Sequence, residues 1–195
     1  MSAKVHEDAE LTLPPTESDE AEIAIRDAVP EDLPFIWSGW GRSYRIGDLC
    51  QGVGNDDYFE AHRQVINILL ARCTVLVACD SRFPSVLVGF TCAEALNDGT
   101  RLLHYIYVKE DFRKDENRGY ISRMLTEALD AIEPAERVVC THRTRRAKKV
   151  MAKNGWGYDP YMLWTSLPEG WLTRGKRRVP EPRPLLEARV RAGAR

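Results

Sequence analysis

One stretch, residues 102–129, constrains the fold of this chain more than any other. An apolar run that ends at Val108 predicts a buried strand, a loop rich in arginine and lysine follows, and Gly119 begins an amphipathic pattern that predicts a helix. The first N–H groups of a helix lack partners within it, and the helix dipole makes that end positive. The stretch therefore predicts a binding site for an anionic, phosphate-bearing ligand.

The remaining chain alternates between strand-like and helix-like patterns. Periodicity predicts strands over 23–27, 74–79, 86–95, 102–108, 137–140 and 161–166, and helices over 32–44, 57–72, 121–132 and 144–154. Asn97, Asp98 and Gly99 predict a tight turn, and Gly155 predicts the end of the last helix. The order β-α-α-β-β-β-α-β-α-β predicts an α/β (α+β) fold, with a central mixed, mostly antiparallel sheet flanked by helices.

Composition narrows the class of protein. Hydrophobic residues make up 44% and charged residues 29% of the 195 residues, as in a single globular domain. No apolar run approaches the roughly 18 residues of a membrane span, and no signal-peptide pattern occurs, so we expect a cytoplasmic protein without a membrane partner. The five cysteines form no CxxC pair, which predicts reduced, buried thiols and no metal site.

The net charge of −1 hides an uneven distribution. Residues 1–22 are acidic and contain proline, which predicts a disordered leader, and residues 171–195 predict a basic tail that is solvated or docks a subunit. The folded domain is therefore expected over 23–170, with the oligomeric state open and a homodimer among the alternatives. A second basic cluster runs from Arg143 to Lys149, and a solvated face, contact with a ligand phosphate or contact with nucleic acid would each explain it.

Two motifs carry a resemblance to a known family. The stretches VKEDFR (108–113) and GYISRML (119–125) follow a strand–loop–helix motif, with Ile121 where the motif has its second glycine and a loop three residues longer. The later stretch TRRAKKVMAKNGW (144–156) keeps an alanine, a glycine and an aromatic residue at the intervals of a second motif. With the order of elements, these motifs resemble the GNAT superfamily of acyl-CoA-dependent N-acyltransferases over residues 23–166, as a divergent member.

The resemblance implies direct transfer of an acetyl or related acyl group from acyl-CoA to a primary amine of an unidentified acceptor. It also implies that CoA is bound by the strand end, the loop, the helix start and the start of the basic helix, through Tyr107, Val108, Arg113, Lys114, Arg118, Gly119, Tyr120, Ile121, Ser122 and Thr144. The family often protonates the departing thiolate with a tyrosine, whose place Met151 takes here. Tyr158 or Tyr105 would then supply that proton, or the thiolate would leave without an acid.

The incoming amine must also lose a proton, which requires a base. His104, in the fourth predicted strand, has a suitable unperturbed pKa, although a structural histidine inside a sheet would fit the same position. Glu94 is the alternative carboxylate, and His142, just after the fifth predicted strand, ranks below His104. Alternation along the strand places His104 on the face of Ile106 and Tyr105 on the opposite face.

An aromatic stripe supplies candidates for the acceptor side. Trp37, Trp40 and Tyr44 recur at helical spacing, which core packing or an acceptor pocket would explain. The same region lines the acceptor pocket in the resembled family, so these residues and the neighbouring Arg42 are the substrate candidates.

Two other functions stay open. A GNAT-like DNA-modifying protein of phage type, or a nucleic-acid-binding protein, would use the basic cluster and tail on the phosphates and could stack a flipped base on the tryptophans. A non-catalytic binding module on a GNAT scaffold would explain Met151 and Ile121. Fold alone does not separate these functions from acyl transfer.

Overall fold

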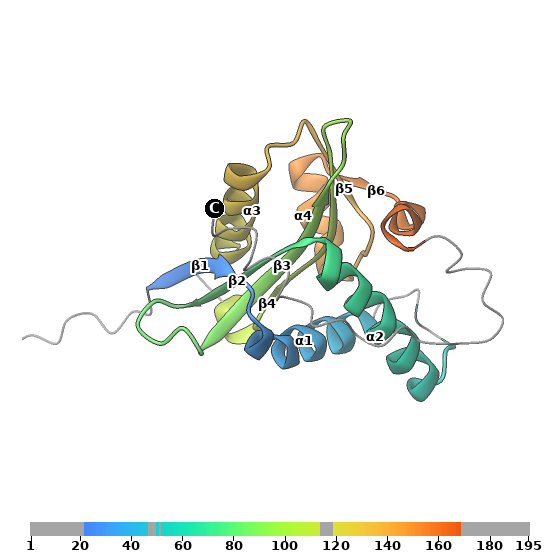
Figure 1. Cartoon of the computed structure of the whole chain (residues 1–195), viewed down its shortest axis with the longest axis horizontal. Coiled ribbons are helices and arrows are strands. Elements are labelled where there is room, and N and C mark those ends of the chain that lie inside the picture. Colours follow the sequence, from blue (N-terminus) through green and yellow to red (C-terminus); the bar gives the residue numbers. More distant parts are fainter. Residues whose placement is uncertain (1–21, 47–49, 51, 114–118, 169–195) are drawn as a thin grey trace, which may run out of the picture.

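The computed structural model describes residues 22–46, 50, 52–113 and 119–168. Within these residues the chain forms one six-stranded sheet, in the order β1-β2-β3-β4-β5-β6 (Figure 1). The leader expected at 1–22 lies outside them except for its last residue, and the tail expected at 171–195, Lys114 and Arg118 lie outside them entirely. None of the described helices is long and apolar enough to cross a membrane.

The elements follow the predicted order. The strands are β1 (Ile23–Asp27), β2 (Thr74–Asp80), β3 (Leu87–Ala95), β4 (Thr100–Val108), β5 (Arg137–Cys140) and β6 (Gly157–Tyr158). The helices are α1 (Leu33–Arg45), α2 (Asn55–Arg72), α3 (Tyr120–Ile132) and α4 (Arg145–Asn154), with short 3-10 helices η1 (Pro30–Asp32), η3 (Glu110–Arg113) and η5 (Pro160–Ser166). β1 to β4 pair antiparallel, whereas β5 pairs parallel with both β4 and β6. The predicted fold class is confirmed.

Helices cover both faces of the sheet (Figure 1). Along β2, alternate residues enter two different cores: Val75 and Val77 pack with α1 and α2, and Leu76 and Ala78 pack with α3 and α4. We call these the first core and the second core. A strand buried on both faces reads as a continuous apolar run, which explains the sequence of β2.

Both ends of α4 have capping residues, of which the sequence predicted Gly155. The Thr144 hydroxyl accepts a hydrogen bond from the backbone N–H of Ala147 at 3.1 Å, so this predicted CoA contact also caps the helix. Gly155 ends the helix in a left-handed conformation with a φ of 66°, which a residue without a Cβ adopts at low cost.

The last predicted strand is wrong. The residues predicted as a strand over 161–166 form η5, and the sixth strand is the two-residue β6 that precedes it. Pro160 begins η5 because its ring sets a helical φ, and the Asp159 carboxylate accepts a hydrogen bond from the N–H of Tyr161 at 2.9 Å. These start signals outweigh the strand propensity of the aromatic and β-branched residues that follow.

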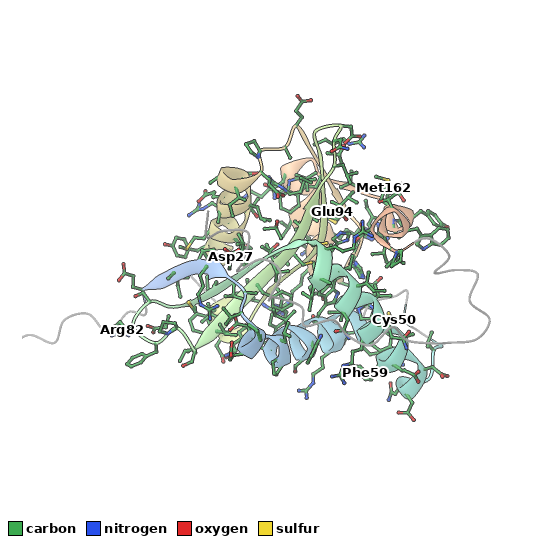
Figure 2. The ribbon with its side chains drawn as sticks, viewed as in Figure 1. Asp27, Cys50, Phe59, Arg82, Glu94 and Met162 are labelled. Atoms are coloured by element: carbon green, nitrogen blue, oxygen red, sulfur yellow. The ribbon has the colours of Figure 1, made fainter. Side chains whose placement is uncertain are left out.

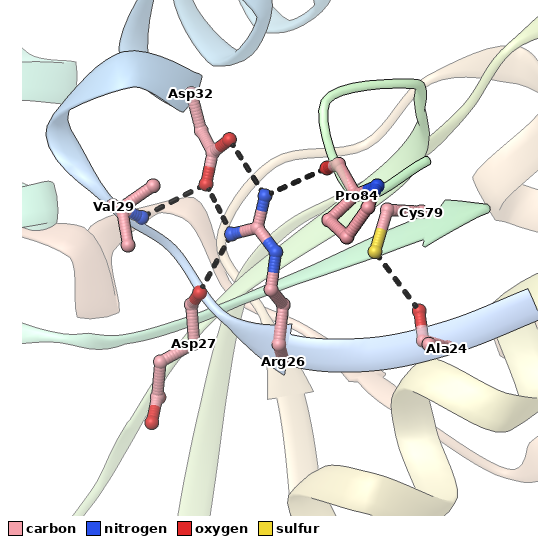
Figure 3. Close-up of polar contacts among 7 residues, drawn as sticks. All are labelled: Ala24, Arg26, Asp27, Val29, Asp32, Cys79 and Pro84. Atoms are coloured by element: carbon pink, nitrogen blue, oxygen red, sulfur yellow. Dashed lines mark hydrogen bonds and ion pairs between the residues drawn. The ribbon is translucent and has the colours of Figure 1, made fainter. Parts of the chain in front are cut away.

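Arg26 ties the first strand to the start of α1 (Figure 3). Its two terminal nitrogens donate to both carboxylate oxygens of the buried Asp32, at 2.6 and 3.0 Å, and also to the carbonyls of Asp27 and Pro84, each at 3.0 Å. The Asp32 carboxylate also accepts from the N–H of Val29 at 2.8 Å. One guanidinium therefore holds together β1, η1 and the turn between β2 and β3.

Both ends of α3 are fixed against β4. At the C-terminal end, the buried Arg101 of β4 donates to Asp130 at 2.5 Å and to the carbonyls of Leu129 and Glu133, where a cation also suits the helix dipole. At the N-terminal end, Ile121 packs into the second core. The helix is thereby aligned along the strand that borders the site described below.

A glycine on β3 lets β4 come close. A Cβ on Gly89 would lie 2.8 Å from the carbonyl oxygen of Tyr107, too close for the backbone to keep its place. We expect Gly89→Ala to lower the free energy of unfolding by about 1–3 kcal/mol. The control is Gly41→Ala in α1, where the new Cβ meets only the Phe59 ring at 3.5 Å and a helix glycine is removed, so stability should rise by up to about 1 kcal/mol. Urea unfolding measures both, and an equal shift in the two variants would contradict the close approach.

Candidate functional site

β4 has an open edge in its C-terminal half. It pairs with β3 from Arg101 to Val108, but its ladder with β5 runs only from Thr100 to Leu103. One further bond follows, from the N–H of Thr141 to the carbonyl of Leu103 at 3.2 Å. Among the described residues, positions 105–108 therefore have a strand on one side only. We call this segment the open edge of β4, and its backbone groups can pair with an extended, amide-containing ligand.

The start of α3 lies beside the end of this open edge. Gly119 precedes the helix with a φ of 87°, and Ser122 Oγ donates to its carbonyl at 2.9 Å. A Cβ on Gly89 would lie 3.3 Å from Ile121 Cγ2 and 3.4 Å from Val108 Cγ2, which places the first turn of α3 against the end of β4. The side chain of Ile121 is turned into the second core, so it does not cover the N–H groups at the helix start.

Cations gather near the same strand end. Arg113 Nε donates to the carbonyl of Val108, and its guanidinium lies 5.0 Å above the Tyr107 ring. Burial lowers the pKa of Arg113, and the nearby Arg146 adds to this effect. An anion bound at the start of α3 would relieve the repulsion between the two guanidinium groups. The exposed Tyr120 lies on the same turn, and the CoA roles of all these residues stay predictions.

His104 lies at a bulge of β4. The β3–β4 register shifts between Cys92 and Ala93, so β4 has one residue more than β3 at this point. The extra residue interrupts the alternation expected from the sequence. His104 contacts Cys73, a member of the first core, whereas Ile106 packs against the second core, so the expected shared face is wrong.

Side chains from four other segments enclose His104, which is 0% exposed. Its Nδ1 lies 2.9 Å from Thr141 Oγ1, and its Nε2 lies 3.4 Å from Ser166 Oγ and 3.7 Å from Glu94 Oε2. The Cys73 Sγ lies within 4.8 Å of a nitrogen of the same ring. Figure 2 labels Glu94, whose side chain is 19% exposed near the end of β3. His104 therefore reaches a bound substrate only through another group.

The surroundings of His104 favour its charged form. Burial acts to lower the pKa of His104, but Cys73 and Glu94 together outweigh burial, and the pKa is raised. The pKa of Glu94 is lowered, first by its interaction with His104, whose Nε2 lies 3.7 Å from Glu94 Oε2. The pKa of the Cys73 thiol is lowered by hydrogen bonds from Cys92 and then His104, against the opposing effect of burial. An imidazolium at His104 would thus be paired rather than isolated.

Thr141 connects His104 to a second histidine. Its Oγ1 lies 3.0 Å from Nδ1 of His142, so one hydroxyl bridges the two rings. Burial lowers the pKa of His142 well below its ordinary value, and His62 and His104 lower it further. His142 is therefore neutral at pH 7, in contrast to the charge-stabilising surroundings of His104.

His142 belongs to an aromatic cluster between the sheet and the first two helices. The cluster consists of Trp40, Tyr44, Tyr58, His62, Tyr105 and His142. Ring centroids are 4.7 Å apart for Tyr44 and His142, and 4.8 Å apart for the stacked rings of Trp40 and Tyr105. Burial raises the pKa of Tyr105 to about 12, and it also raises the pKa values of the other two tyrosines, so the cluster carries no formal charge at neutral pH.

Two buried nitrogens of the aromatic cluster are unsatisfied. Trp40 Nε1 and His62 Nε2 have no hydrogen-bond partner among the described residues. Because buried polar atoms are ordinarily paired, these two are suited to polar atoms of a ligand. By contrast, the Tyr105 hydroxyl is paired with Ser43 Oγ at 2.7 Å.

The predicted substrate residues divide between two places. Trp40 and Tyr44 belong to the aromatic cluster, but Trp37 Nε1 donates to Asn67 Oδ1 of α2 at 2.8 Å and carries the Arg63 guanidinium above its ring at 4.7 Å. Arg42 is exposed on α1. The stripe thus serves a helix–helix contact at one end and the aromatic cluster at the other, and its role in acceptor binding stays a prediction.

Tyr158 holds an unpaired hydroxyl next to the end of β5. It pairs with Cys140 in the β5–β6 ladder, and its buried OH has no partner among the described residues. The Arg143 guanidinium lies 4.3 Å from the centre of its ring, and burial raises the pKa of Tyr158, which keeps its proton at neutral pH. Met151, at the position of the family's tyrosine, is buried in the second core.

One group of described side chains is compact enough to share a metal ion. The ligand atoms of Cys73, Glu94 and His104 lie within 4.8 Å of one another, and sulfur, nitrogen and oxygen ligands of this kind suit Zn²⁺. The His104 ring nitrogens are already paired with Thr141 and Ser166, whereas Glu94 Oε2 has no hydrogen-bond partner among the described residues. The expectation that no metal is bound stays a prediction.

Sequence reasoning missed several residues of this site. Thr141, Cys73 and Ser166 come from three separate segments and form no motif with His104, so no spacing could have revealed them. His62 shares the apolar stripe of α2, where its position reads as helix packing. The one usable signal was the pair Thr141–His142, two polar residues directly after a buried strand.

Neither a protein-family model nor a curated protein sequence matches the chain. Solved structures do. An acetyltransferase of the GNAT family from Staphylococcus aureus Mu50 has a TM-score of 0.48 at 16% identity, over 69% of this chain and 84% of its own. The chain resembles GNAT acetyltransferases.

Other GNAT-like structures give similar values. Ribosomal-protein-alanine N-acetyltransferase from Brucella melitensis has a TM-score of 0.44 at 15% identity, over 68% of this chain and 82% of its own. AAC(6')-Iy in complex with the bisubstrate analogue CoA-S-monomethyl-acetylneamine has a TM-score of 0.43 at 16% identity, over 69% of this chain and 90% of its own. These structures are of the kind that the motifs predicted, and the likeness to them concerns the fold alone.

The neutral histidines of the aromatic cluster predict a loss of stability in mild acid. Burial lowers the pKa of His62 from 6.5 to about 4. Between these values the unfolded chain binds a proton that the folded chain does not, so the free energy of unfolding falls as the pH falls. We expect His62→Phe to reduce the fall between pH 6.5 and pH 5, by up to about 1.4 kcal/mol per pH unit. Urea unfolding across this range measures the slope, and equal slopes in the variant and the natural chain would contradict a neutral, buried His62.

Proposed function

We propose that this protein is an acyl-CoA-dependent N-acyltransferase, which passes an acetyl or related acyl group to a primary amine. The observation that carries the proposal is the open edge of β4 beside the start of α3. An acyl-CoA has an amide-containing arm that can pair with a strand edge, and a pyrophosphate that suits a helix N-terminus. The motifs at 108–113 and 119–125 fall at these two elements.

The two proton transfers of this reaction have candidate groups on either side of the open edge. The amine must lose a proton before it attacks the thioester, and the departing thiolate gains from a nearby acid. Tyr158 keeps its proton at neutral pH and lies beside Cys140, where β5 leaves β4. We assign it the role of acid, and we place the base among the buried histidines on the other side.

The acceptor that we propose is a primary amine, without a more specific identity. Among the described residues, the aromatic cluster contains no carboxylate that would pair with a polycationic acceptor. An amine attached to an uncharged, flat or apolar body suits it better. Phenethylamine, glucosamine and lysine ethyl ester form a first panel, because they present an aromatic, a sugar and a cationic body.

The anion site can be tested by a charge at the start of α3. Ser122→Glu places a carboxylate in the first turn, where it suits the helix dipole and should stabilise the fold by about 0.3–1 kcal/mol. The same carboxylate would repel the CoA pyrophosphate, so we expect CoA affinity to fall tenfold or more. Calorimetric titration with CoA measures the binding, and thermal unfolding measures the stability.

The control adds the same charge at the other end of the helix. Ala131→Glu lies nine residues along α3, about 13 Å away, and should leave CoA affinity unchanged. Pantetheine lacks the pyrophosphate and should bind both variants alike. If the natural chain does not bind CoA, or Ser122→Glu binds it equally well, the cofactor assignment fails.

Loss of the tyrosine proton should slow turnover without weakening CoA binding. Tyr158→Phe keeps the ring under Arg143 but cannot protonate a thiolate, so we expect kcat to fall by about 10²–10⁴-fold with KM for acetyl-CoA unchanged. The control is Tyr161→Phe, an exposed tyrosine of η5 that should keep full activity. Release of CoA from acetyl-CoA in the presence of the amine panel gives the rates. An unchanged kcat in Tyr158→Phe would remove this residue from the mechanism.

The alternatives make different predictions for the same samples. A non-catalytic module would bind acetyl-CoA and release no CoA with any amine. A nucleic-acid-binding protein would be stabilised by duplex or single-stranded DNA in a salt-sensitive manner, and its contacts would include the exposed residues Arg143, Arg145, Lys148 and Lys149.

A further inference from the structure

The hydroxyl of Thr141 stands between two imidazole rings that differ sharply in their surroundings. Its Oγ1 lies 2.9 Å from Nδ1 of His104 and 3.0 Å from Nδ1 of His142, and all three side chains are buried. We propose that these residues form a proton relay, in which a proton taken up at Nε2 of His142 is stored as positive charge on His104. As the base of the acyl transfer, the relay rests on the function proposed above.

A count of the hydrogens leaves two arrangements of the hydrogen-bonded series His142–Thr141–His104. A threonine hydroxyl has one hydrogen, so it donates to one ring and accepts from the other. Glu94 and Ser166 lie on the Nε2 side of His104, and an ionised carboxylate there favours a proton on Nε2. Thr141 then donates to Nδ1 of His104 and accepts from Nδ1 of His142. This arrangement leaves the lone pair of His142 on Nε2, as a base requires.

Uptake of a proton reverses the direction of both hydrogen bonds in this series. Nε2 of His142 forms a bond to the proton released by the amine, and the His142 Nδ1 proton moves to Thr141 Oγ1. The original hydroxyl proton of Thr141 moves to Nδ1 of His104. Three bonds to hydrogen break and three form, so His142 ends neutral and His104 ends as an imidazolium. After the product leaves, the same steps in reverse return the proton from Nε2 of His142 to water.

The surroundings of the two rings give this transfer its direction. His142 faces Trp40 and Tyr44 of α1, His62 of α2 and Tyr105 of β4, none of which carries a negative charge at neutral pH. A charge left on His142 would therefore be buried without a counter-ion, which is costly. Transfer of this charge through the Thr141 hydroxyl to His104 removes that cost.

His104 faces groups of the opposite kind. Cys73 comes from the end of α2, Glu94 from β3 and Ser166 from η5, and Arg72 lies 3.7 Å from Glu94 on its outer side. The carboxylate and the thiol both favour an imidazolium at this position. In this proposal His142 is the catalytic residue that takes the proton of the amine, and Thr141 and His104 are positioning residues that act through it.

The relay predicts a change of tautomer that can be observed by NMR without a substrate. When His104 gains its charge, its Nδ1 becomes a donor, Thr141 must turn its hydrogen toward Nδ1 of His142, and the His142 proton must move to Nε2. His142 should therefore change tautomer while it stays neutral, at the same pH at which His104 titrates. Two-bond ¹H–¹⁵N spectra of the full, ¹⁵N-labelled chain between pH 5 and pH 9 distinguish each tautomer from the imidazolium. Spectra of His104→Gln and His142→Gln assign the signals.

Substitutions at Thr141 test the hydroxyl. Thr141→Val keeps the shape but has no hydrogen to share, so the coupled tautomer change of His142 should be lost. Thr141→Ser keeps the hydroxyl and should retain the change. Thermal unfolding confirms that each variant is folded, and the spectra of the natural chain carry the test if Thr141→Val does not fold.

Three results would overturn the relay. One is a His142 tautomer that stays the same through the titration of His104, and another is a coupled change that persists in Thr141→Val. The third is a stoichiometric zinc ion in the purified chain, because the metal would take the place of the proton on Nε2 of His104. If the relay is seen and CoA does not bind, the proposed function fails while the coupling between the histidines stands.

Discussion

The short ladder between β4 and β5 determines the rest of this site. β4 has nine residues, yet β5 pairs with it only as far as Leu103. Had β5 continued, it would have satisfied the backbone at 105–108 and left no edge for a ligand. Instead the chain turns away after Cys140, toward the face covered by α1 and α2. That turn places Thr141 against His104 and His142 in the aromatic cluster. Because the β4–β5 ladder ends early, the fold has both the open edge and the hydrogen-bonded series of His104, Thr141 and His142 beside it.

The frame around the open edge is held by buried charged groups at its far ends. Arg101 fixes the C-terminal end of α3, and Arg26 fixes the start of α1 through Asp32. Hydrogen bonds to charged groups in partly buried places contribute more than neutral ones, and the loss of one partner leaves the other uncompensated. Each of these two helices, one on each side of the sheet, is thus anchored at one end. A rigid frame of this kind can hold a reactive geometry without contributions from the ligand.

Features that depend on one element were predictable from the sequence. The helix that Gly155 ends and the continuous apolar run of β2 both follow from local rules, and each was found where expected. The order of strands and helices follows for the same reason. The segment at 161–166 failed because Pro160 and Asp159 start a 3-10 helix, and a strand pattern alone does not count those start signals.

Features that depend on several elements were not predictable. The burial of His104 requires a bulge in the β3–β4 register, which alternation cannot reveal, and side chains from the end of α2, from β3 and from η5. Trp37 and Trp40 look equivalent on one helical stripe, but α1 meets α2 on one side and the sheet on the other, so they separate. The resemblance implied that the strand end at 107–108 and the helix start at 119–122 act together, and the two do lie close to each other. It could not name Thr141, which follows β5 and packs against His104.

The position of Trp40 has an optical consequence. Its indole is stacked on Tyr105, lies edge-on to His142 at 5.4 Å between ring centroids and is 0% exposed. An excited indole gives up an electron readily to a cationic imidazole in contact with it and poorly to a neutral one, so its light emission reports on the charge of that neighbour. Buried indoles also emit at shorter wavelength than exposed ones such as Trp164 of η5. The molecule therefore contains a fluorophore of its own at the inner end of the site, next to the ring of His142.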